Sequence, residues 1–158
     1  MSIVFYLKLI YMIISRTAIS GTQAILKDNI LNLLQMLFYT SFISDYSECS
    51  IWFEPSTLKL CSDIVSHLTE NGIKITASPI TEQAHSYFPK VLIILFPNQE
   101  PENLPFEAEF QKLTGKISTL PAPTLLFAAS TNKDLPLIKS LHSWSTLFQN
   151  GRLIQPAP

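Results

Sequence analysis

The sequence KVLIILFP, at residues 90–97, contains six consecutive large apolar residues between a lysine and a proline. Such a run has no polar side to turn toward water, so other elements must cover both of its faces. We therefore predict a three-layer α/β fold, with this run as the central strand of a mostly parallel sheet of four or five strands and helices on both faces. A buried helix is the alternative, but six residues are few for a helix, and Pro89 and Pro97 bracket the run.

Composition favours one domain and excludes several classes of protein. The 158 residues are 47% apolar and 15% charged, which suffices for a single core. The net charge of -1 comes without a clustered basic surface, so we expect no nucleic-acid partner. The four glycines lie too far apart to form a glycine-rich phosphate loop, and we expect no cofactor.

The first twenty residues have the pattern of a signal peptide. Apolar residues 3–7 and 9–14 are followed by Ala18-Ile19-Ser20, which places small residues at the two positions that a signal peptidase inspects. We predict cleavage after Ser20 and a chain that is secreted or lies on the extracellular side of the plasma membrane. The mature domain then spans residues 21–154, with a tail at 155–158. Two alternatives stay open: a retained membrane anchor, which Lys8 and the short length disfavour, and a buried N-terminal strand.

Apolar periodicity predicts the remaining elements. Spacings of three and four predict a helix from residue 23 to about residue 42, and a second helix that Ser56 or Thr57 caps and Asn71-Gly72 ends. The other predicted elements are helices over residues 106–117 and 134–150, strands over residues 49–53, 73–77 and 124–129, and a last strand that begins at Arg152. Residues 49–77 then form one strand-helix-strand crossover unit.

Cys49 and Cys61 leave two interpretations. An even number of cysteines in a secreted chain favours a disulfide. Cys49, however, is predicted in a strand and Cys61 on the apolar side of the following helix, and such layers lie about 10 Å apart, beyond disulfide reach. We therefore favour two small, separately buried thiols.

The sequence contains no constellation that indicates catalysis or metal binding. His67, His85 and His142 never occur three or four residues apart, and only Glu82 with His85 has even a loose ligand spacing. No serine lies between glycines as in a nucleophile elbow. We expect no metal, no catalytic residue and no enzymatic activity.

Several features then follow one another in a recognisable order. They are the apparent signal peptide, the amphipathic helix, the strand with Cys49, the helix that ends at Asn71-Gly72, the 90–96 strand, Pro123-Thr124-Leu125-Leu126-Phe127, Leu141-His142-Ser143-Trp144 and Phe148-Gln149-Asn150-Gly151. This order resembles the N-terminal extracellular region of insect ionotropic chemosensory receptors, of the variant ionotropic glutamate receptor family. The resemblance extends over residues 1–154, and it implies a single periplasmic-binding-protein-like lobe.

The chain also departs from that family. Its residues contain no two-lobed ligand-binding region with an agonist-binding arginine and no pore helices, so no functional residue of the family maps onto a position here. The resemblance therefore implies a truncated receptor or a free N-terminal domain, without channel activity of its own.

These observations leave two main expectations for function. The first is a binding or assembly module of a chemosensory receptor-like protein, and the alternative is a small secreted or virus-derived interaction protein of similar fold. An enzyme is the third and least favoured class. The expected partner is a protein or a receptor subunit, and a membrane only through an uncleaved N-terminal segment or a missing C-terminal part.

We predict the contact surface at the carboxyl ends of the strands, where the loops of open α/β sheets leave a crevice. A single lobe cannot enclose a small molecule, which favours a protein partner. The loops at this position are residues 54–56, 78–86, 97–104 and 130–134, and the candidate partner-binding residues on them are Glu54, Glu82, His85, Glu100, Glu102 and Asn132.

Overall fold

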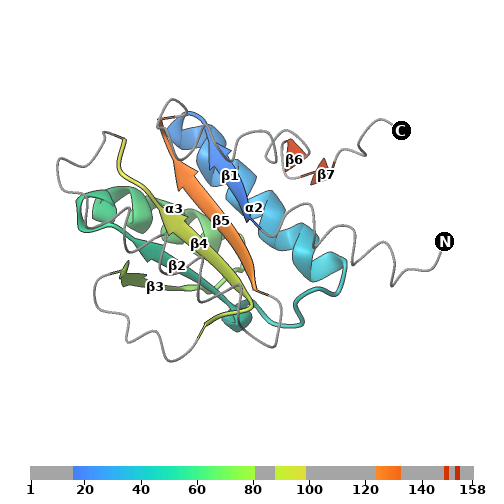
Figure 1. Ribbon diagram of the computed structural model, residues 1–158. Coiled ribbons are helices and arrows are strands. Elements are labelled where there is room, and N and C mark those ends of the chain that lie inside the picture. The colour runs from blue at the N-terminus through green and yellow to red at the C-terminus, as the bar shows by residue number, and fades with distance from the viewer. Residues whose placement is uncertain (1–15, 81–87, 99–123, 133–147, 150–151, 154–158) are drawn as a thin grey trace.

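The computed structural model describes residues 16–80, 88–98, 124–132, 148–149 and 152–153. Five parallel strands form one sheet in the order β1-β5-β4-β2-β3 (Figure 1). The strands are β1 (Arg16–Ser20), β2 (Cys49–Phe53), β3 (Thr76–Pro79), β4 (Val91–Leu95) and β5 (Leu125–Ser130). The predicted α/β fold with a parallel sheet is confirmed, and β4 is its central strand.

β4 is buried on both faces, which explains why it carries no polar side chain. Val91, Ile93 and Leu95 belong to the core between the sheet and the helices. Leu92 and Ile94 alternate with them and are equally inaccessible to solvent on the opposite face. Each fully buried side chain of this size contributes about 2 kcal/mol of apolar transfer free energy, so β4 is a main source of stability.

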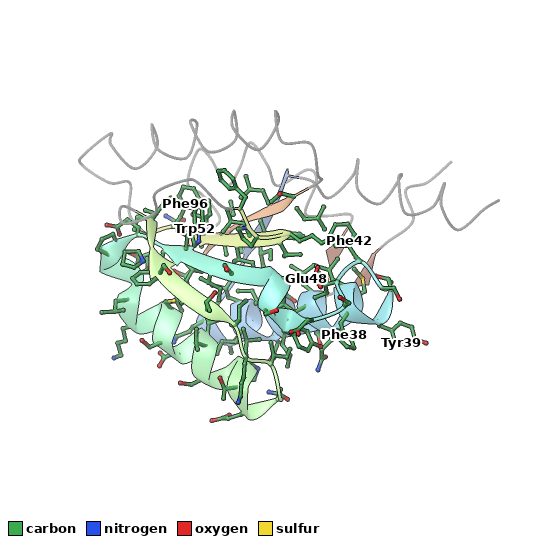
Figure 2. All side chains as sticks on the ribbon, turned by 90° about the horizontal axis from the view of Figure 1, so that it is seen from below. Phe38, Tyr39, Phe42, Glu48, Trp52 and Phe96 are labelled. Atoms are coloured by element: carbon green, nitrogen blue, oxygen red, sulfur yellow. The ribbon has the colours of Figure 1, made fainter. Side chains whose placement is uncertain are left out.

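Two helices, α2 (Gln23–Tyr39) and α3 (Leu58–Glu70), pack side by side against one face of the sheet (Figure 2). Their buried apolar stripes are Leu26, Ile30, Leu33, Leu34 and Leu37 in α2 and Cys61, Ile64 and Leu68 in α3. In the described part of the chain, no helix has the length and apolar character that crossing a membrane requires. The helix predicted over residues 106–117, and residues 134–147 of the helix predicted over residues 134–150, fall outside the described residues, and the two described helices cover one face.

The end of α3 lies at Asn71-Gly72, as predicted, and it sets the start of the next strand. Gly72 has a φ of 81°, and the N–H of Ile73 donates to the Leu68 carbonyl at 2.9 Å. The Ile73 amide is thus bonded to α3, and β3 pairs with β2 only from Thr76 onward. The prediction of a strand over residues 73–77 is therefore correct in kind and wrong in its bounds.

The edge strand β1 is formed by residues that precede the predicted cleavage position. β1 pairs with β5 from Arg16 opposite Leu126 to Ser20 opposite Ser130, and Ile19 is part of the core. A strand, as in one of the open alternatives for the N-terminal segment, is therefore present at residues 16–20, and Ile19 within it is buried. Cleavage after Ser20 stays a prediction, and it would remove this strand from the sheet.

The C-terminal part differs from the expected helix and fifth strand. β6 (Phe148–Gln149) and β7 (Arg152–Leu153) pair with each other in antiparallel fashion, in a separate two-stranded sheet. The predictions that the helix continues to residue 150 and that Arg152 starts a strand of the main sheet are therefore wrong. The sequence between the two strands is Asn150-Gly151, the dipeptide most favoured in two-residue hairpin turns.

Candidate functional site

The starts of both helices lie at the edge where the parallel strands end, which we call the carboxyl edge. α2 follows β1 and α3 follows β2, so both helices begin there. The chain passes from β2 to β3 in one direction across the sheet and from β4 to β5 in the other direction. The strand order therefore reverses between the neighbouring strands β2 and β4. In open α/β sheets such a reversal leaves a crevice outside the ends of the strands.

Glu54 organises the loop after β2. Its N–H donates to the Leu95 carbonyl at 3.2 Å and so ties the end of β2 to the end of β4. Its carboxylate accepts from the Ser56 N–H at 3.0 Å and from the Ser56 hydroxyl, and it thereby caps the short 3-10 helix η2 (Pro55–Thr57). The Thr57 hydroxyl donates to the Glu54 carbonyl at 2.7 Å.

These bonds correct the predicted cap of α3. Thr57 occupies the N-cap position but its side chain makes no cap hydrogen bond. The hydroxyls of Ser56 and Thr57 serve the turn that Glu54 makes, so neither of them caps α3 with its side chain. The first turn of α3 therefore continues directly from η2. Residues of η2 and residues of α3 line the same crevice.

Hydrogen bonds also join the loops after β4 and β5. The Ser130 hydroxyl donates to the Pro97 carbonyl at 3.3 Å and accepts from the Asn132 N–H at 3.1 Å. The side-chain amide of Asn132 donates to the Asn98 carbonyl at 2.7 Å. Together these bonds hold residues 97–98 against the end of β5.

A hollow of about 300 Å³ lies among these loops and helix starts. Its lining residues come from α2, from η2 and α3, and from the loops after β4 and β5: Gln23, Ser56, Thr57, Lys59, Leu60, Asp63, Phe96, Pro97, Asn98 and Thr131. Gln23 Nε2 donates to Asp63 Oδ2 at 2.7 Å and so links the two helices. Lys59 and Asp63 have opposite charges one turn apart, so this wall of the hollow is polar without a strong net charge.

The six predicted site residues divide into two groups. Glu54 and Asn132 lie at the carboxyl edge, next to the residues that line the hollow, and their side chains are engaged in the loop hydrogen bonds. Glu82, His85, Glu100 and Glu102 lie outside the described residues, so their partner-binding role stays a prediction.

The loops predicted from the sequence do not include three lining residues on the polar sides of the helices, Gln23, Lys59 and Asp63. Periodicity assigns all three to the solvated side of their helices, and no motif singles them out. The signal that would have found them is positional, because a helix that directly follows a parallel strand begins at the carboxyl edge of the sheet. For α2, this positional signal can be used only when residues 16–20 are already known to form a strand before the helix.

The described residues bear on two further kinds of chemistry, metal binding and thiol chemistry. Among them, no three His, Cys, Asp or Glu side chains are placed to hold a metal ion. Cys49 and Cys61 are buried, separate thiols, as favoured from the sequence. Burial raises the pKa of Cys49 to about 12, with a contribution from the charges of Glu48 and Asp45, and burial raises the pKa of Cys61 to about 11. Thiols that stay protonated at neutral pH are poor nucleophiles.

Comparisons of the chain with models of known families, with curated proteins and with solved structures found no match. The structure itself defines an α/β protein with a five-stranded parallel sheet and a hollow of mixed polar and apolar lining at its carboxyl edge.

Proposed function

We propose that the chain is a non-catalytic binding or assembly module whose partner contacts the carboxyl edge of the sheet. The observation that carries this proposal is the hollow beside the reversal of strand order between β2 and β4. Ligands of open α/β sheets bind at such reversals, because the loops on either side diverge there. We further propose that the module belongs to the extracellular N-terminal region of a chemosensory receptor-like protein, which the order of the sequence features supports.

The surroundings of the hollow favour a protein as the partner. Its volume of about 300 Å³ lies at the lower limit of small-molecule pockets. Two large aliphatic side chains at the helix starts, Ile25 and Leu58, are 47% and 56% exposed, and they are close in sequence to the lining residues. Exposed apolar anchors beside polar groups are the composition of a protein interface.

Photo-cross-linking in the tissue that expresses the chain tests this surface. A photoreactive residue in place of Lys59 should form one defined adduct with a protein partner. The matched control replaces Lys74, which is also an exposed lysine but lies between α3 and β3 at the other edge. An adduct from position 74 and none from position 59 would place the contact surface elsewhere.

The transcript distinguishes the receptor-like setting from the alternative. A longer transcript that encodes membrane spans after Ile154 would support a receptor module. An independently expressed reading frame that ends at Pro158 would instead support the alternative, a small secreted or virus-derived interaction protein that uses the same edge.

A further inference from the structure

We draw no further inference here: the strongest candidate, the surface patch formed by the exposed rings of Phe38 and Tyr39 at the end of α2, carries no proposal because nothing in the described residues shows what covers it.

Discussion

At the scale of single residues, two glycines hold conformations that other residues rarely adopt. Gly72 has a φ of 81° and open space around its missing side chain, whereas at Gly21, with a φ of 151°, an added Cβ would lie 2.8 Å from Ile25 Cγ2. Gly72 follows the C-cap of α3, and Gly21 lies in the short connection between β1 and α2. The first position therefore tests backbone strain alone, and the second tests strain together with contact.

We expect Gly72→Ala to lower the free energy of unfolding by about 1 kcal/mol, the cost of a left-handed alanine. Gly21→Ala should cost about 2 kcal/mol, because Ile25 must also move. Urea unfolding of the two variants and the wild type measures both effects. A neutral Gly21→Ala would show that the chain before α2 is not held in the position of β1.

At the scale of elements, β4 should tolerate no charge. Ile94→Asp places a carboxylate without a partner on a fully buried face, which should cost about 4 kcal/mol or more and abolish soluble expression. The control Leu58→Asp introduces the same group at an exposed helix start, where a negative charge is favourable, and should change stability by less than about 0.5 kcal/mol. Equal tolerance of the two substitutions would mean that β4 is not the centre of the sheet.

The elements also show how far local sequence determines this fold. The bounds of β2 and the stop at Asn71-Gly72 follow from composition, because each has a strong local cause. The start of β3 does not, since the alternation begins at Ile73, whose N–H is bonded to α3, whereas pairing with β2 begins at Thr76. β1 was ambiguous because an apolar stretch with small residues suits both a signal peptide and an edge strand.

The candidate site was less predictable than the fold. Topology alone indicated the carboxyl edge, and Glu54 and Asn132 do lie there, but both side chains are bonded within their own loops. Gln23, Lys59 and Asp63 line the hollow because α2 and α3 start next to each other, with Gln23 bonded to Asp63. That relation joins residues 40 apart in the chain, and no local pattern contains it.

At the scale of the whole molecule, the two edges of the sheet have different characters. The carboxyl edge has a hollow lined by polar and apolar side chains among hydrogen-bonded loops, and the opposite edge, where the strands begin, has the exposed rings of Phe38 and Tyr39. We propose that the first contacts a protein partner. This proposal depends on a sheet that includes β1, because β1 pairs with β5 and lies directly before α2.

Hydrogen exchange on the full chain expressed in insect cells tests that sheet most directly. The account predicts that peptides covering residues 16–20 are present and that alternate amides in them exchange slowly, since a parallel edge strand bonds every second amide to β5. Residues 91–95, at the centre of the sheet, should exchange most slowly and serve as the internal reference. Absence of residues 16–20, or exchange there as fast as in a free peptide while residues 91–95 stay protected, would contradict the five-stranded sheet.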